Sequence, residues 1–210
     1  YEFLREMEFN RLLSQAISFY GEPDNKDFDA EIKSKKISMI DTKSYKSILK
    51  EKELDKLIKE LNKKTVIAVD TETSSLNPQE AELIGISICY AANVSFYIPL
   101  GHKDTKGLTK EFVIKKLKII LEDSSIKKVG QNLKYDFIIF KKHGVELNSV
   151  EDTMLLSYTL DAGNNRHNMD ILSEIHLGHK TISYKDLVGT GKKQLNFSEI
   201  DLKSATEYAA

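Results

Sequence analysis

The sequence contains little of what is typical of disulfide-linked, metal-binding or membrane proteins. Cys89 is its single cysteine, which excludes a disulfide framework and a cysteine-ligated zinc site. Cys89 lies in an apolar run, so we expect it to be a small buried hydrophobe. No apolar run reaches the ~18 residues that span a membrane, and the sequence does not open on a signal-peptide pattern. These absences predict a cytoplasmic protein with no membrane partner.

An excess of positive charge is also missing, although DNA-binding domains usually carry one. The formal net charge is −1, and the lysine pairs at 127–128, 141–142 and 192–193 are expected to be solvated surface. The five histidines do not follow a zinc spacing, and we assign none of them a catalytic role. With 40% apolar and 30% charged residues, the 210-residue chain is typical of one globular domain plus an extension.

A run of apolar residues at 66–69 ends in two carboxylates, Asp70 and Glu72. The run predicts a short buried strand, and the alternation of a strand places Asp70 and Glu72 on one side. Two carboxylates on one face repel each other unless a cation lies between them. Oxygen ligands favour Mg²⁺ or Mn²⁺ at such a site. Taken alone, such a pair is more often a solvated strand end that carries two surface acids.

A second informative stretch spans residues 129–136 and reads V-G-Q-N-L-K-Y-D. A strand passing through Gly130 into a helix would place Asn132 near the helix cap. Asp136 then lies about one turn into the helix and can point back toward the strand ends. A third acidic group beside Asp70 and Glu72 would suffice for a second metal ion. The alternative for Asp136 alone is an acid on the helix surface.

Together the two stretches resemble a known family. D-T-E-T-x-S-L at residues 70–76 and G-Q-N-L-K-Y-D at 130–136 are similar to the 3′→5′ exonuclease domain of bacterial DNA polymerase I. This domain is the proofreading module of family A DNA polymerases, within the DEDD exonuclease superfamily. The resemblance covers residues 65–210, with further matches in order at 152–155, 166–170, 179–182 and 189–195.

The resemblance implies a site and a reaction. Asp70, Glu72 and Asp136 would hold two divalent ions, Mg²⁺ or Mn²⁺, and Tyr208 would orient the attacking water. Leu76 would wedge between the last two bases and Phe197 would stack on a base. The implied strand path is completed by Thr71, Gln131, Asn132, Lys134, Tyr135, Arg166 and Met169. Without the resemblance, Leu76 and Met169 would be assigned to core packing.

The family pattern closes with Tyr-x-x-x-Asp, whose aspartate is the fourth metal-site carboxylate. Tyr208 matches, whereas the aspartate would fall two residues beyond Ala210. We therefore expect a truncated form of a longer protein, with the metal site empty or singly occupied in this fragment. The implied partners are the single-stranded 3′ end of DNA and a polymerase domain C-terminal in the same chain, with the protein a monomer.

The expected fold is α/β, a ribonuclease H-like exonuclease fold whose mixed sheet contains an antiparallel hairpin and is flanked by helices. We place an N-terminal amphipathic helix at 1–19 and a linker at 20–36, giving an extension over 1–36 and an exonuclease domain over 37–210. Expected strands are 37–40, 65–70, 82–91, 93–99, 127–130 and 150–152. Expected helices are 51–62, 109–121, one around Asp136, 152–160, 168–176 and 202–210, with loops at 178–197.

Two other functions remain open on the sequence. A catalytically silent module would keep this fold for structure alone, but the three carboxylates argue against it. A stand-alone ribonuclease of the ribonuclease D type would share the carboxylates. The match at residues 189–195 and the polymerase-like N-terminal helix argue against that alternative.

Overall fold

The computed structural model describes residues 1–21, 44–163 and 165–210. The chain divides into two compact units, Tyr1–Ser38 and Met39–Ala210, and each is described by itself. Most of the expected linker at 20–36 and all of the expected strand at 37–40 lie outside the described residues. Within the described residues, no helix has the length and apolar character needed to cross a membrane.

The N-terminal unit contains two short helices where one was predicted. Helix α1 (Glu2–Glu6) and helix α2 (Asn10–Tyr20) are separated at Glu8, which has a φ of 56°. This left-handed conformation interrupts the helical hydrogen bonds, so the prediction of a continuous helix over 1–19 is wrong. Neither helix contains a buried residue.

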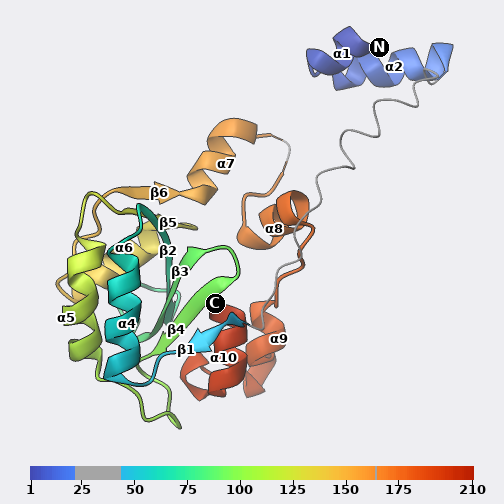
Figure 1. Cartoon of the computed structure of the whole chain (residues 1–210). Coiled ribbons are helices and arrows are strands. Elements are labelled where there is room, and N and C mark those ends of the chain that lie inside the picture. The colour runs from blue at the N-terminus through green and yellow to red at the C-terminus, as the bar shows by residue number, and fades with distance from the viewer. Residues whose placement is uncertain (22–43, 164) are drawn as a thin grey trace. The chain divides into compact units, whose positions relative to one another are not determined.

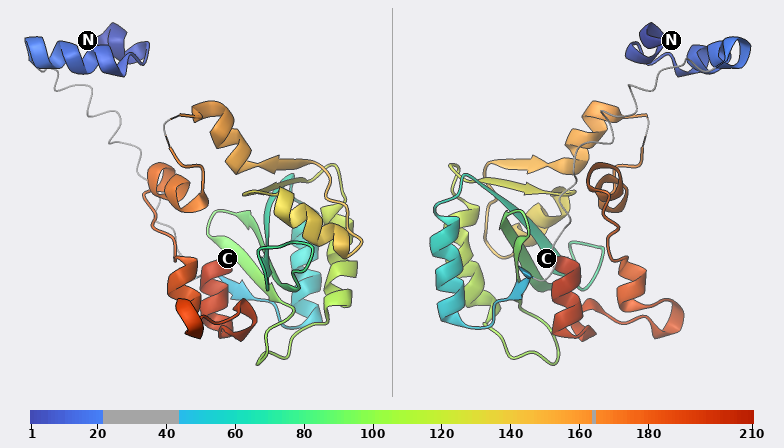
Figure 2. Two further views of the ribbon diagram at one scale, coloured as in Figure 1. Left: turned by 180° about the vertical axis from the view of Figure 1, so that it is seen from behind. Right: turned by 45° about the vertical axis from the view of Figure 1, so that its right-hand side comes forward.

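The main unit is built on a six-stranded mixed sheet in the order β1-β4-β3-β2-β5-β6 (Figures 1 and 2). The pairs β2–β3 and β3–β4 are antiparallel, and the pairs β1–β4, β2–β5 and β5–β6 are parallel. The mixed sheet and its hairpin confirm the predicted fold class. The strands are β1 (Lys46–Ser47), β2 (Val66–Thr73), β3 (Leu83–Ala91), β4 (Val94–Pro99), β5 (Lys127–Gly130) and β6 (Val150–Asp152).

One side of the sheet is covered by α4 (Glu51–Leu61), α5 (Lys110–Leu121) and α6 (Lys134–Lys142) (Figure 1). The larger apolar core lies between these helices and the sheet. Helix α4 contributes Leu54, Leu57 and Leu61, which recur at the spacing of one helical face. Helix α5 begins after Thr109, whose hydroxyl accepts a hydrogen bond from the backbone N–H of Phe112. Both helices confirm the sequence prediction.

A second, smaller core lies under α10 (Leu202–Ala209), which packs on β4 and β1. It contains Tyr97, Phe197 and Ala205, and the Ser47 and Thr206 hydroxyls are 2.8 Å apart at its margin. The stretch predicted as loops contains short helical turns at α9 (Tyr184–Val188), η2 (Gly191–Lys193) and η3 (Phe197–Glu199). Helices α7 (Thr153–Asp161) and α8 (Met169–Leu177) follow β6 in the sequence and precede α9.

Two predictions about burial are corrected. Lys128, expected at the surface, is fully buried, and its ammonium donates to the carbonyls of Asp123 and Ile126, both at 2.6 Å. These carbonyls satisfy the ammonium inside the fold, which hydropathy alone does not reveal. Cys89, expected to be buried, is only partly so, and its thiol lies 3.1 Å from the carbonyl of Ala91.

Glycine at position 85 is required by the packing of the sheet. Gly85 on β3 pairs with Glu72 on β2, and a Cβ built there would lie 2.1 Å from the Tyr97 hydroxyl oxygen. Tyr97 is fully buried and bonded to Nε2 of His102 at 2.7 Å, so it cannot move aside. We expect Gly85→Ala to lower the free energy of unfolding by about 1–2 kcal/mol in a urea titration. Gly163→Ala, where a Cβ meets nothing, is the control, and an equal midpoint for both variants would contradict the packing argument.

Candidate active site

Strand β2 presents two carboxylates on one face of the sheet. Ile67, Val69 and Thr71 alternate into the larger core and are buried. Asp70 and Glu72 therefore point to the opposite face, as the sequence predicts, and both are partly exposed. The first turn of α6 brings the third predicted acid, Asp136, to the same end of β2.

Asp136 is held by β2 itself. Its carboxylate oxygen Oδ1 accepts hydrogen bonds from the backbone N–H of Thr71 at 2.9 Å and from the Thr71 hydroxyl at 2.5 Å. Asp136 is only 2% exposed, so the alternative of a helix-surface acid is wrong. The chain reaches this position because Gly130 lets β5 approach β2. A Cβ at Gly130 would lie 2.8 Å from the carbonyl oxygen of Val69.

The turn into α6 is capped by a residue from another strand. The carboxylate of Asp152, at the end of β6, accepts from the backbone N–H groups of Asn132 at 3.0 Å and Leu133 at 2.8 Å. As the predicted cap of α7, it also accepts from the N–H groups of Met154 at 2.9 Å and Leu155 at 3.4 Å. Asn132 lies next to the helix start, as predicted. The N-cap residue itself is Leu133, and the Leu133 side chain makes no capping hydrogen bond. Asp152 thus fixes the direction in which α6 presents Asp136.

Removing this double cap should weaken the fold. We expect Asp152→Ala to lower the free energy of unfolding by about 1–2 kcal/mol, because four backbone N–H groups lose their acceptor. Asp152→Asn keeps one acceptor oxygen and should lose less. Urea denaturation of both variants beside the surface variant Asp104→Ala measures the effect. A midpoint for Asp152→Ala equal to that of Asp104→Ala would show that the cap contributes nothing.

The three acids sit in an electrostatic environment that disfavours their charged forms. Burial and the neighbouring Asp136 raise the pKa of Asp70 to about 7. Burial, Asp70 and Asp136 raise the pKa of Glu72 to about 8, and burial raises the pKa of Asp136 to about 6. Among the residues that the structure describes, none of the ion pairs involves these three carboxylates. A cation placed between them would remove the repulsion.

The donor chemistry fits a hard divalent cation, because all three side chains offer oxygen. In the described part of the chain, however, no three histidine, cysteine, aspartate or glutamate side chains form a ready metal-binding group. Oδ1 of Asp136 is already engaged by Thr71, which leaves its other oxygen for a ligand. The arrangement is therefore an open, partial donor set rather than a closed cage.

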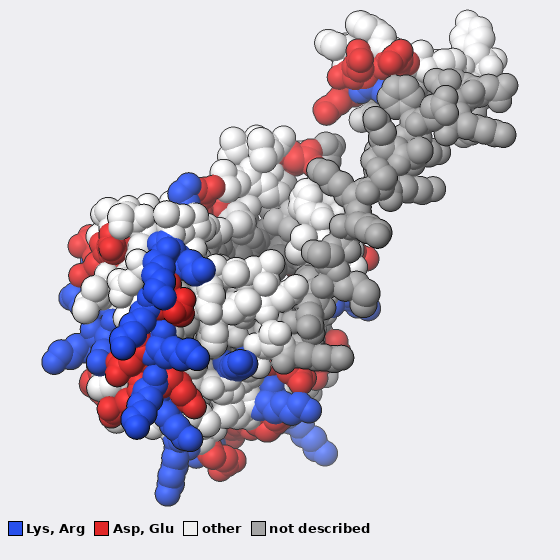
Figure 3. Space-filling view, in the orientation of Figure 1, with Lys and Arg blue, Asp and Glu red and all other residues white. Residues whose placement is uncertain are grey.

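The acids lie in a cleft of about 1380 Å³. Lys180 is the one lysine or arginine that lines it among the described residues, whereas six acidic side chains do. Figure 3 shows that lysine and arginine side chains on the displayed face gather over α4 and α5, mixed with acids, and no residue of these helices lines the cleft. Predicted site residues in the lining are Asp70, Thr71, Glu72, Leu76, Gln131, Asn132, Tyr135, Asp136, Met169 and Tyr208.

Three predicted site residues lie elsewhere. Lys134 and Arg166 are exposed but do not line the cleft. Phe197 is 1% exposed, and its ring packs against His102 and Tyr208 with centroids 5.7 and 5.9 Å apart. No face of Phe197 is available to a base, so the prediction that it stacks on one is contradicted.

One aromatic residue that no sequence motif indicates also lines the cleft. Tyr184 is 41% exposed, and its ring centroid lies 6.2 Å from that of Tyr208. The available signal was Ser183, whose hydroxyl accepts from the N–H of Asp186 and caps α9. Tyr184 is the first residue of this helix.

The alternative of core packing is wrong for the two apolar residues of the predicted path. Leu76 is 95% exposed and Met169 is 50% exposed, and both line the cleft. Tyr208 projects from α10 toward the acids, and burial together with the charges of Glu72 and Asp70 raises the pKa of its phenol above the ordinary value. The Tyr208 hydroxyl therefore stays protonated and can donate a hydrogen bond in the cleft.

Two solved structures that superpose on this chain show the same fold. The Aedes aegypti Nibbler EXO domain superposes with a TM-score of 0.61 at 14% identity, covering 81% of this chain and 83% of that one. Escherichia coli RNase D, an exoribonuclease, superposes with a TM-score of 0.57 at 20% identity, over 78% of this chain and 41% of that one. At these identities the likeness establishes the ribonuclease H-like fold alone.

Sequence relatives are more specific. This chain is 42% identical over 177 residues to DNA polymerase I of Rhizobium leguminosarum, a match covering 75% of the chain and 17% of the relative. It is 40% identical over 177 residues to DNA polymerase I of Borreliella burgdorferi, a match that covers 83% of this chain and 19% of the relative. The chain therefore spans less than a fifth of the length of these relatives. A family model described as 3′-5′ exonuclease matches residues 45–210, the segment that builds the acidic cleft, and the chain belongs to that exonuclease family.

Proposed function

We propose that this chain is the proofreading domain of a DNA polymerase I, which removes mismatched 3′-terminal nucleotides by metal-assisted hydrolysis during replication and repair. In the intact protein a DNA-directed polymerase domain would follow it. The observation that carries the proposal is the trio of Asp70, Glu72 and Asp136, which β2 and α6 bring to one cleft. Within the described part of the chain, none of the ion pairs involves these three carboxylates.

Asp70, Glu72 and Asp136 are the residues that would hold Mg²⁺ or Mn²⁺, in two sites. Such ions, when bound, lower the pKa of an attacking water and neutralise charge on the leaving 3′ oxygen. Thr71 supports this arrangement by fixing the orientation of Asp136 through two hydrogen bonds. Because Thr71 also lines the cleft, its predicted contact to DNA stays part of the proposal. The negative lining of the cleft is otherwise unsuited to a phosphate, which is a further argument for the ions.

Tyr208 is proposed to orient the nucleophilic water. Its phenol is too weak an acid to act as a base at neutral pH, because burial and two nearby carboxylates hold the proton on it. The hydroxyl remains a donor and acceptor at a fixed place on α10. Glu72, at the end of β2, is proposed to assist Tyr208 in holding the same water.

The grip on DNA is proposed to be apolar and aromatic. Leu76 and Met169 expose apolar surface to the cleft, and Tyr184 offers the ring that Phe197 does not. Stacking on such groups is worth ~1–3 kcal/mol per base and tolerates any base, which suits an editing site. A mismatched end frays more easily, so it reaches a single-strand site at lower cost. Gln131, Asn132 and Tyr135 would line the same path.

The ribonuclease D alternative is separated by the sugar of the substrate. The identities of about 40% are to DNA polymerase I, whereas the ribonuclease likeness is one of fold. The test uses DNA and RNA oligonucleotides of one sequence, 5′-labelled, with Mg²⁺ and a chain continued past Ala210 through the expected aspartate. We expect faster shortening of the DNA from its 3′ end. Faster shortening of the RNA would replace the proposal by the exoribonuclease alternative, and no shortening of either would favour a silent module.

A further inference from the structure

The loop at residues 74–82, between β2 and β3, presents a leucine to the cleft. Leu76 lines the cleft and is 95% exposed, so its side chain is held by almost nothing in the protein. An exposed leucine is unremarkable on a mobile loop, but the backbone of this loop is densely bonded. The contrast between a fixed backbone and a free apolar side chain indicates a contact prepared for a ligand.

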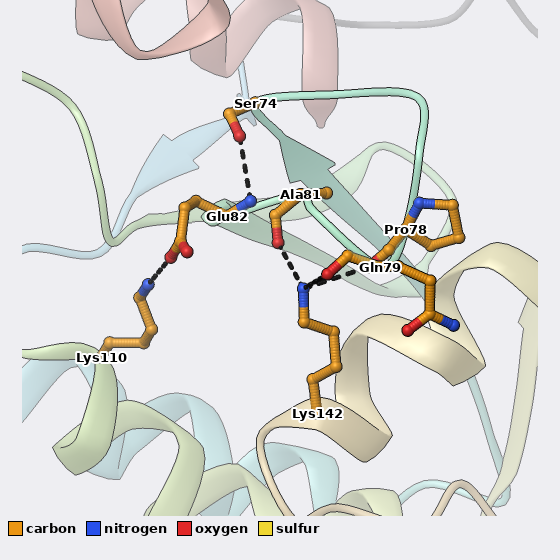
Figure 4. A network of polar contacts seen from close by, with 7 residues as sticks. All are labelled: Ser74, Pro78, Gln79, Ala81, Glu82, Lys110 and Lys142. Carbon is orange, nitrogen blue, oxygen red and sulfur yellow. Dashed lines mark hydrogen bonds and ion pairs between the residues drawn. The ribbon is translucent and has the colours of Figure 1, made fainter.

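The two ends of the loop are closed by Ser74 and Glu82 (Figure 4). The N–H of Ser74 donates to the carbonyl of Glu82 at 3.0 Å, and the N–H of Glu82 donates to the Ser74 hydroxyl at 2.9 Å. Inside the loop, the carbonyl of Asn77 accepts from the N–H groups of Glu80 at 3.1 Å and Ala81 at 2.9 Å. These bonds define a turn at residues 77–81, immediately after Leu76 in the sequence.

Lys142, at the end of α6, holds this turn through three hydrogen bonds, which we call the clasp. The ammonium of Lys142 donates to the carbonyls of Pro78 at 3.1 Å, Gln79 at 2.9 Å and Ala81 at 2.8 Å (Figure 4). An ammonium has three N–H donors, and here all three meet carbonyls of a single turn. A second tie is the ion pair of Lys110 with Glu82 at 3.3 Å, in which the glutamate is largely exposed.

The clasp links the loop to the helix that holds a catalytic acid. Asp136 lies in the first turn of α6, bonded to Thr71 on β2, and Lys142 lies in the last turn. Helix α6 therefore sets the distance between the carboxylates and the loop that carries Leu76. A loop ordered before binding loses less conformational entropy when the DNA end arrives.

We propose that Lys142 is a positioning residue for the substrate: it fixes the loop at residues 74–82 so that Leu76 stands preorganised against the 3′ end. This inference rests on the proposed function of the cleft. Lys142 does not line the cleft, and it acts through the backbone carbonyls of the loop. Its removal should therefore weaken substrate binding and leave the hydrolytic step unchanged.

The test compares Lys142→Met and Lys142→Arg with Lys141→Met in a chain continued past Ala210. Lys141 is the matched control because it is the neighbouring lysine on the same helix, and its ammonium lies over the ring of Phe137, 5.9 Å from the centroid, rather than on the loop. On single-stranded DNA with Mg²⁺, Lys142→Met should raise KM about fivefold with kcat within about twofold. Lys142→Arg should restore most of the KM, since guanidinium N–H groups can still reach carbonyls, and Lys141→Met should match the wild type.

A double-mutant cycle with Leu76→Ala asks whether Lys142 acts through Leu76. If it does, Lys142→Met adds little to the KM of Leu76→Ala, so the two effects are not additive. Additive effects, or a KM of Lys142→Met equal to that of Lys141→Met in an active protein, would overturn the positioning role alone. A wild type that does not shorten DNA would overturn the proposed function itself. Amide hydrogen exchange across residues 74–82 supports the clasp if it is faster in Lys142→Met than in Lys141→Met, and refutes it if it is not.

Discussion

Replacing Asp70 with asparagine is expected to reduce the rate of DNA shortening by about 10³-fold or more, because the amide cannot supply the negative charge that an ion in the cleft requires. Asp70 shares the cleft with Glu72 on its own strand and with Asp136 on α6, and it raises the pKa of Glu72. Loss of its charge therefore affects every ion that the cleft could hold. Single-turnover rates at saturating DNA and Mg²⁺ measure the effect on the chemical step.

The matched control for this prediction is Asp55→Asn. Asp55 is an acid on α4 that pairs with Lys116 at 2.8 Å and does not line the cleft. It should keep wild-type activity. Asp70→Asn should unfold at the same or a higher temperature than the wild type without metal, because it removes a charge whose burial is unfavourable. Activity of Asp70→Asn within tenfold of the wild type would show that Asp70 is not part of the catalytic site.

Removal of divalent metal is expected to abolish activity and to destabilise the protein. A ligand that binds only the folded state at 100 times its Kd stabilises it by about 2.7 kcal/mol. We therefore expect Mg²⁺ to raise the melting temperature of the chain continued past Ala210, and EDTA to reverse the change. The double variant Asp70→Asn/Glu72→Gln should show no such shift, since both donors on β2 are lost.

The stability of the metal-free protein and its stabilisation by Mg²⁺ should both depend on pH. Without metal, the folded state holds protons on Asp70 and Glu72 up to pKa values of about 7 and 8, above the ordinary values of unfolded carboxyls. Stability should therefore fall as pH rises from about 4.5 to 8. Mg²⁺ competes with these protons, so the shift in melting temperature should be larger at pH 8 than at pH 6. A shift equal at both values, or equal in the double variant, would place the metal elsewhere.

The sequence was sufficient where local pattern determines structure. The alternation in residues 66–72 placed Asp70 and Glu72 on one face because the buried face of β2 is continuous. Helix α5 followed from Thr109 and the spacing of its apolar residues. Both features depend on neighbours within a few residues, and the hairpin of β3 and β4 is local in the same way.

Features that depend on contacts between residues far apart in the sequence could not be predicted from local sequence patterns. The burial of Asp136 requires Thr71, 65 residues away in the sequence, and the cap on Leu133 comes from Asp152 on another strand. Phe197 and Tyr184 are both aromatic, and only tertiary packing decides that one ring is buried and the other faces the cleft. The resemblance to a family supplied roles for site residues that no pattern of hydropathy could assign.

The most direct test of the account is Mg²⁺-dependent degradation of 5′-labelled single-stranded DNA by the chain continued past Ala210. It is run beside the Asp70→Ala/Glu72→Ala double variant and in EDTA. We expect a ladder of products shortened from the 3′ end, absent in the double variant and in EDTA. A well-folded wild type that yields no ladder would contradict it, and would leave a structural module with the fold of a nuclease.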